Sequence, residues 1–254
     1  MKRLFNSSLW LIIVALIFTS CSKDEDVQPD FEDVEFGFDI DNPPLIIPDG
    51  IKNSTDMNAG QIYGHLTMAN SIVYIVSAMQ PPSGATKSDE SIFGRIGGDS
   101  GRTANIKTNV SAYTWTITDG NESLTYGYQL SETSTHYIFE LFIKENNNEF
   151  IKYWHSERSK NGKQGFLELY DEDDHSLSIR FEWDETALGV FRFNILSDNE
   201  KINITSNPDY SGSIKVFENG KLQNHITWNA NGTAGTYVYY NSNEEVEESG
   251  VWPE

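Results

Sequence analysis

The sequence has a single cysteine, Cys21, in 254 residues. One cysteine cannot form a disulfide within the chain, so stability must come from a packed core. Positive charge is also scarce, because 18 lysines and arginines stand against 38 aspartates and glutamates, for a net charge of -20. Nucleic-acid-binding proteins need a basic surface, so this balance argues against a nucleic-acid partner. It also provides no attraction to an anionic membrane surface.

The sequence lacks the spacings that mark common catalytic and metal sites. It has no Gly-x-Ser-x-Gly nucleophile elbow and no His-Glu-x-x-His zinc motif. The glycine-rich residues 94–101 are not followed by the Lys-Ser/Thr pair of a P-loop. We therefore name no catalytic residue and expect a non-enzymatic protein. The alternative is a carboxylate-dependent glycoside hydrolase, which would require folding to gather Glu140, Glu168 and Glu182 from distant strands.

The N-terminus carries an apolar run that is too short to cross a membrane. Lys2 and Arg3 precede the apolar residues 9–18, whereas a spanning helix needs about 20 apolar residues. A short positive region, a short apolar region and then small residues are typical of a secretory signal. The small residues Thr19 and Ser20 lead directly into Cys21.

The segment Phe18-Thr19-Ser20-Cys21 resembles the lipobox of bacterial lipoproteins. The resemblance implies cleavage before Cys21, a diacylglyceryl thioether on its sulfur, and a further acyl chain such as palmitate on the new N-terminus. Several acyl chains anchor a protein stably in a membrane. Residues 22–30 are similar to the acidic export signal of Bacteroidota surface lipoproteins, which implies a lipid-anchored protein on the outer face of the outer membrane.

We expect three regions along the chain. Residues 1–20 would be the signal peptide, residues 21–53 an acidic tether and extended lead-in, and residues 54–254 a β-rich domain. Residues 34–40 alternate in polarity and predict a short strand within the lead-in. Residues 81–105 are polar and rich in glycine, which indicates a long loop.

One helix is predicted over residues 56–79. Ser54 or Asp56 could cap its N-terminus, and the prolines at positions 81 and 82 would end it. Apolar residues recur at helical spacing along it, which predicts a buried stripe. Residues 72–79 are apolar on nearly every side, so we expect this half of the helix to be deeply buried. The stripe consists of Ile62, Leu66, Ala69, Ile72, Val73, Val76 and Met79.

From residue 110 to 240 the pattern changes to period two, with turn signals between short apolar segments. This pattern is typical of an antiparallel meander. We expect a mainly β fold in which about ten strands curl into a barrel or half-barrel, lipocalin-like or lipoprotein-carrier-like, with the helix against the concave face. One face should be buried and carries Tyr113, Trp115, Ile117, Tyr137, Phe139, Leu141, Phe181, Trp183, Phe191 and Phe193.

Residues 212–241 are similar to MORN-type β-hairpin repeats. Gly212 and Gly235 are spaced about 23 residues apart, and Phe217, Tyr239 and Tyr240 occupy the aromatic positions of the repeat. The resemblance covers a small part of the chain and implies stacked hairpins.

Two candidate binding sites follow from the strand pattern. Asp171, Asp173 and Asp174 lie at a predicted hairpin tip, where clustered carboxylate oxygens could bind Ca²⁺; we expect no other cofactor. Aromatic side chains beyond those that one sheet face can bury could stack on sugars or pack on a protein. The candidates are Tyr153, Trp154, Trp228 and Tyr239.

The sequence thus predicts a surface lipoprotein that binds a glycan, a lipid-like molecule or an envelope protein. An accessory subunit of an outer-membrane uptake complex is the second interpretation, and the hydrolase is the third.

Overall fold

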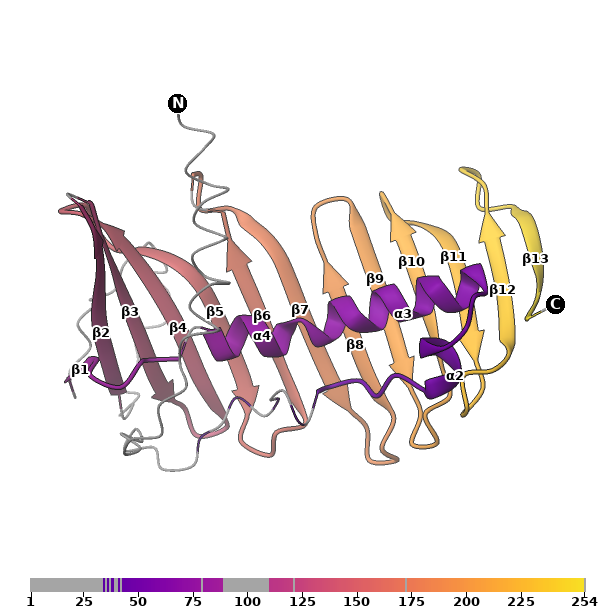
Figure 1. The fold of residues 1–254 in the computed structure, drawn as a ribbon, viewed down its shortest axis with the longest axis horizontal. Helices are drawn as coiled ribbons and strands as arrows, with labels where there is room; N and C mark the ends of the chain where they lie inside the picture. Colours follow the sequence, from indigo (N-terminus) through magenta and orange to yellow (C-terminus); the bar gives the residue numbers. More distant parts are fainter. Residues whose placement is uncertain are drawn as a thin grey trace.

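The computed structural model describes residues 34, 36, 38, 41, 43–78, 80–88, 110–120, 122–171 and 173–253. Within these residues, thirteen strands form one antiparallel sheet whose spatial order is the same as the order in sequence. Figure 1 shows the strands side by side along the long axis, with a helical segment running across one face. The predicted antiparallel meander is confirmed.

The strands have the following bounds: β1 Thr86–Ser88, β2 Val110–Asp119, β3 Glu122–Glu132, β4 His136–Glu145, β5 Ile151–Ser159, β6 Gln164–Tyr170, β7 Leu177–Glu185, β8 Phe191–Leu196, β9 Glu200–Ser206, β10 Gly212–Glu218, β11 Lys221–Trp228, β12 Gly235–Tyr240 and β13 Val246–Trp252. From β2 onward, short turns join consecutive strands, and the residues at several tips have positive φ. Asn219 and Gly220, at the tip of the β10–β11 hairpin, both adopt such a conformation, which is the geometry of a tight hairpin turn.

Three helices lie on one face of the sheet: α2 (Asp49–Lys52), α3 (Met57–Asn70) and α4 (Ile72–Ala78). Asp56 caps α3, because its side chain accepts hydrogen bonds from the backbone N–H groups of Asn58 and Ala59. Ser71 is a turn residue between α3 and α4. The predicted single helix is therefore interrupted there and consists of two nearly continuous helices (Figure 1).

The core lies between this helix pair and the sheet. Ile62, Leu66, Ala69, Ile72, Val73 and Val76 are all at most 5% exposed, so the described part of the predicted stripe is buried. Met79, its last predicted member, lies outside the described residues. The sheet residues predicted to share a buried face all belong to the core or pack against it. Val34, Phe36 and Phe38 lie outside any strand, contrary to the strand predicted there, and also pack on the core. We call this sheet surface the helix face.

The barrel alternative is wrong, because the described sheet is open. β1 and β13 lie at opposite ends of the strand order and are not paired with each other. The helix pair covers the apolar surface that a closed barrel would cover with its own opposite wall. The strand number is also higher than expected: β1 falls in the predicted loop, and β13 has a charged sequence with little alternation, as an exposed edge strand often has.

The expectation of a deeply buried second half of the helix is also wrong. Tyr74 is 53% exposed, and the side of the helix pair that points away from the sheet is not covered by any described part of the chain. Apolar character all around a helix normally reflects burial on all sides. Here only the sheet-facing side is buried.

Three glycines on the helix face stand directly opposite tryptophans on the next strand. A Cβ atom on Gly212 would lie 2.3 Å from Cζ2 of Trp228, so the indole ring occupies the volume that a side chain would need. The ring covers the glycine backbone and holds the strand pair in register. The three register pairs are Gly165–Trp183, Gly212–Trp228 and Gly235–Trp252.

We expect Gly212→Ala to lower the free energy of unfolding by about 2 kcal/mol, because the added methyl group must displace the Trp228 ring or the Thr205 carbonyl. Thermal and urea unfolding would measure the change. The matched control is Gly60→Ala on the exposed side of α3, where no atom lies within 4 Å of the new Cβ. The control should be neutral or stabilising, and a Gly212→Ala protein as stable as the control would contradict this account.

Candidate binding face on the sheet

The sheet surface that points away from the helices, which we call the open face, carries a band of polar and charged side chains. Because side chains alternate along a strand, residues between the core positions of β3 to β9 must point to this face. Their register partners continue the band from strand to strand. We call the following residues the polar band: Gln129, Glu140, Lys152, His155, Glu157, Glu168, Arg180, Glu182, Asn194 and Asn203.

The polar band contains two ionic clusters, one that includes Lys152 and one that includes Arg180. In the first, Glu140 lies at the centre: Lys152 Nζ donates to Glu140 Oε1 at 2.8 Å, and Gln129 Nε2 donates to Glu140 Oε2 at 3.2 Å. His155 Nδ1 lies 3.5 Å from Glu140 Oε1, and His155 Nε2 lies 3.3 Å from Glu157 Oε1. The imidazole therefore bridges two carboxylates.

This arrangement changes the protonation of both central groups. Burial raises the pKa of Glu140, but the contact with His155 and the charge of Lys152 outweigh burial and lower the pKa to about 2. Burial lowers the pKa of His155, but its contacts with Glu140 and Glu157 outweigh that effect and raise the pKa. Glu140 is therefore an anion near neutral pH, and the site favours the cationic form of His155.

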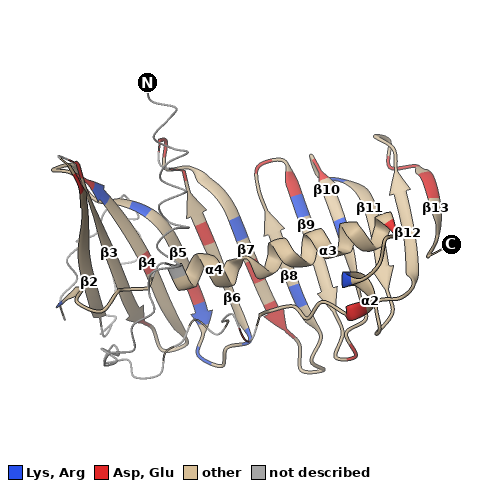
Figure 2. Cartoon of the chain, viewed as in Figure 1, with Lys and Arg blue, Asp and Glu red and all other residues tan. Residues whose placement is uncertain are grey.

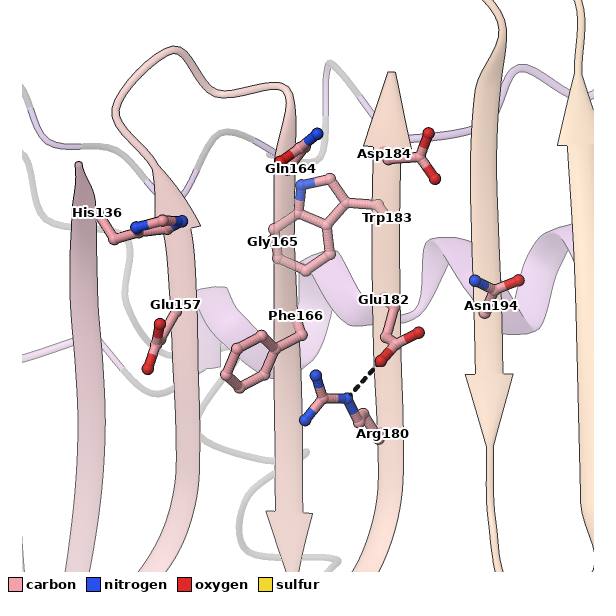
Figure 3. A pocket seen from close by; sticks show the side chains of 10 residues that line it. All are labelled: His136, Glu157, Gln164, Gly165, Phe166, Arg180, Glu182, Trp183, Asp184 and Asn194. Carbon is pink, nitrogen blue, oxygen red and sulfur yellow. Dashed lines mark hydrogen bonds and ion pairs between the residues drawn. The ribbon is translucent and has the colours of Figure 1, made fainter. Parts of the chain in front are cut away.

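In the second cluster, Arg180 joins two glutamates. Its Nε donates to Glu182 Oε1 at 2.7 Å, and its Nη1 donates to Glu168 Oε1. The guanidinium also lies 4.0 Å from the centre of the Phe166 ring, a cation–π contact. Tyr170 completes the cluster by donating its hydroxyl to Glu168 Oε2 at 2.7 Å; burial and this carboxylate raise the pKa of Tyr170. Figure 3 shows Arg180 between Phe166 and Glu182.

A hollow of about 310 Å³ lies beside this second cluster. Its size is at the lower end of the range for small-ligand sites. In Figure 3 the helix lies behind the strands, and side chains from β4 to β8 surround the hollow. Most of its lining is polar and planar: His136, Glu157, Gln164, Arg180, Glu182, Asp184 and Asn194, with Gly165, Phe166 and Trp183 as the remaining members.

The open face brings together the three carboxylates on which the hydrolase alternative depends. Glu140, Glu168 and Glu182 all belong to the polar band, so they are not dispersed. However, each carboxylate faces a cation: Glu140 contacts Lys152, and Arg180 contacts both Glu168 and Glu182. A general acid needs a raised pKa, and the pKa of Glu140 is lowered instead.

The four predicted aromatic ligand residues have packing roles in the structure. Trp154 and Trp228 are at most 4% exposed and belong to the core, and Trp228 Nε1 donates to the Tyr210 carbonyl at 2.8 Å. Tyr153 is partly buried against the core. Tyr239 donates to Asn58 Oδ1 at 2.7 Å and so fastens β12 to α3. The structure does not gather these four residues into one exposed strip; a ligand-binding role for them stays a prediction.

The three predicted calcium ligands lie at the β6–β7 hairpin tip, as expected, where the carboxylates of Asp171 and Asp174 cap the turn. Asp171 accepts from the backbone N–H of Asp173 at 2.7 Å, and Asp174 accepts from that of Ser176 at 2.8 Å. The hydrogen bonds from Ser176 lower the pKa of Asp174. Asp171 and Asp174 also line an acidic hollow of about 850 Å³ with Asp198, Glu200 and Glu218.

Among the described residues, no three histidine, cysteine, aspartate or glutamate side chains are grouped as a metal site. Calcium binding stays a prediction. Cys21 and the segments around it lie outside the described residues. None of the helices in the described part of the chain is long and apolar enough to span a membrane.

No known protein family and no curated protein matches the chain. The lipobox and hairpin-repeat resemblances therefore stay predictions.

Reasoning from the sequence did not identify the polar band as a unit. Arg180, Lys152 and Asn194 were not among the candidates, because none belongs to a motif. Lys152 is two residues from the buried Trp154 and reaches the open face only through the β-bulge between β4 and β5, so alternation does not place it there. Period-two alternation does place Arg180 and Asn194 opposite core residues on their own strands, so that part of the open face could have been inferred. The ion pairs could not, because they depend on the register between strands.

We expect Glu140→Gln to lower the free energy of unfolding by about 2 kcal/mol at pH 6, because Lys152 and His155 would lose their carboxylate. The fold lowers the pKa of Glu140 to about 2 from 4.5. Its contribution is therefore complete above pH 4.5 and is lost as the pH falls toward 2, where variant and parent should converge. Urea unfolding between pH 3 and pH 6 would measure this.

The matched control is Glu185→Gln, which removes an exposed ion pair between Glu185 at the end of β7 and Lys163 in the β5–β6 turn. It should change stability by less than about 0.5 kcal/mol. A Glu140→Gln effect that is independent of pH would contradict the ionic account.

Proposed function

We propose that this is a lipid-anchored cell-surface protein that binds a glycan, without chemical turnover, on the open face of its sheet. The observation that carries the binding part is the hollow between β4 and β8 and its lining of planar polar side chains around an aromatic ring. The anchoring part rests on the sequence around Cys21.

Glycans present many hydroxyl groups and apolar C–H faces, so their sites combine planar hydrogen-bonding side chains with aromatic rings. The lining supplies carboxylates from Glu157, Glu182 and Asp184, an amide from Asn194, and the ring of Phe166. The ion pairs of Arg180 hold its part of the lining in place before a ligand arrives, which reduces the entropy cost of binding.

The carboxylates of the open face are paired with cations, which favours a neutral ligand. The polar band pairs Glu140 with Lys152, and Arg180 with Glu168 and Glu182, while Asp184 faces Arg192 at 3.4 Å. A lipid-like ligand is supported less well, because both hollows described above have mainly polar linings and the apolar helix face is filled by side chains.

The other two interpretations are weaker. An accessory subunit of an outer-membrane uptake complex would use the same anchor and could use the same glycan site, so co-purification from membranes separates it from an isolated binder. A glycoside hydrolase would need a general acid with a raised pKa in the polar band, whereas the pKa of Glu140 is lowered.

We expect the purified protein to be retarded in affinity electrophoresis through at least one neutral polysaccharide from a panel of β-glucan, mannan, xylan and starch. Glu182→Gln and Asn194→Ala should each reduce the retardation at least about tenfold, because each removes a group that lines the hollow.

Glu185→Gln serves as the control, since it makes the same chemical change on the same strand outside the lining. Equal retardation of all variants would refute the site. Release of reducing sugars by the parent, abolished by Glu182→Gln, would refute the absence of turnover.

For the anchor, we expect the parent to fractionate with outer membranes and Cys21→Ser to be found in the soluble fraction, because the acyl chains would be absent. Mass spectrometry should find the mature N-terminus at Cys21 with added lipid. An unmodified Cys21, or a Cys21→Ser variant that remains in the membrane, would contradict the proposal.

A further inference from the structure

The side of α3 and α4 that points away from the sheet is exposed and largely apolar. Met57 is 67% exposed, Tyr63 45%, Met68 37% and Tyr74 53%. At 100° per residue these four side chains fall on one side of the helix, opposite the buried stripe. We call this surface, together with the exposed Gly60, Gly64 and Thr67 between them, the helix ridge.

The helix ridge is also free of charge. Residues 57–78 contain no aspartate, glutamate, lysine or arginine, although such residues make up 22% of the chain. Figure 2 shows the helix pair without red or blue, while charged residues occur on the strands and hairpins around it. A helix side that faces only water normally carries charged residues, so solvent contact does not account for this composition.

The two glycines of the ridge add an independent observation. Gly60 and Gly64 lie within α3, and a Cβ on either would have no atom within 4 Å. Glycine weakens a helix interior, and no described neighbour requires its small size here. One turn apart, they leave a shallow depression between Tyr63 and Met68 that would allow close approach of another helix.

We infer that the helix ridge binds the same ridge on a second copy of this chain, forming a twofold dimer. A twofold interface needs a surface that is complementary to itself, and this one combines protruding tyrosine and methionine side chains with the glycine depression. It also needs a surface without like charges, and a chain of net charge -20 offers that along residues 57–78.

The charge distribution of the chain also favours a second copy over a basic protein as the partner of the helix ridge. A basic protein would be attracted to the carboxylates at the hairpin tips, such as Asp171, Asp174 and Asp198, rather than to the uncharged ridge. The helix pair is about 33 Å long, which limits the contact to the small end of specific interfaces. The dimer should therefore be weak, with a dissociation constant on the order of 10–100 μM.

Sedimentation velocity of the purified protein between 5 and 500 μM would test the dimer. Met68→Glu and Tyr74→Glu should each raise the dissociation constant at least about tenfold, because each places a carboxylate in an apolar contact. Leu188→Glu and Val251→Glu are the controls: they add the same charge at exposed apolar positions outside the helix, and Val251→Glu also tests pairing through the edge strand β13. Neither control should change the dimer.

Two further measurements distinguish a direct effect on the ridge contact from an indirect effect through loss of folding. Gly64→Ala should raise Tm, since alanine favours helix, and yet weaken the dimer about threefold to tenfold by filling the depression. Raising NaCl from 0.05 to 0.5 M should strengthen the dimer, because screening reduces repulsion between two acidic copies.

A protein that is monomeric at 500 μM in 0.5 M NaCl would overturn the inference, and the ridge would then belong to another partner or another segment of this chain. Association that Met68→Glu leaves unchanged, or that Val251→Glu abolishes, would also overturn it. All variants share one N-terminus, so association through that end would not respond to the ridge substitutions.

Discussion

The structure depends on one contact: the apolar stripe of α3 and α4 packed against the apolar face of an open sheet. An antiparallel sheet of thirteen strands has one face that must be covered, and nothing in the strand order closes it. The helix pair runs across the strands and supplies that cover (Figure 1). Ile62, Leu66 and Ile72 are completely buried there, and each such side chain contributes about 1.5–3 kcal/mol on burial.

That contact leaves two surfaces free for other purposes. Because the helices cover one sheet face, the other face remains available, and its alternate residues carry the ion pairs of the polar band. Because only one side of the helices is buried, the helix ridge is also exposed. The acidic residues gather at the hairpin tips, such as Asp171 and Asp174, where carboxylates cap turns. Glycan binding and self-association would therefore use opposite sides of the molecule.

Two devices keep so long a sheet in register. The tryptophan opposite each of Gly165, Gly212 and Gly235 fits only when the strands are aligned, because a shift of one residue would place the ring against a side chain. On the open face, Glu140 and Arg180 make contacts that cross from strand to strand. Apolar packing on one side and ion pairs on the other therefore specify the same alignment.

The sequence by itself determined the local structure. Period-two alternation located most strands, the spacing of Ile62, Leu66 and Val73 located the buried side of the helix, and Ser54 and Asp56 marked the region of its start. These features depend on neighbours a few residues apart, so they can be read from the chain alone. Whether the sheet closes, how much of the helix pair is buried, and which charges meet on the open face were decided only by the tertiary structure. Each depends on contacts between residues far apart in sequence: Arg180 meets Glu168 because of the β6–β7 register, and Tyr74 stays exposed because the helices have the sheet on one side only.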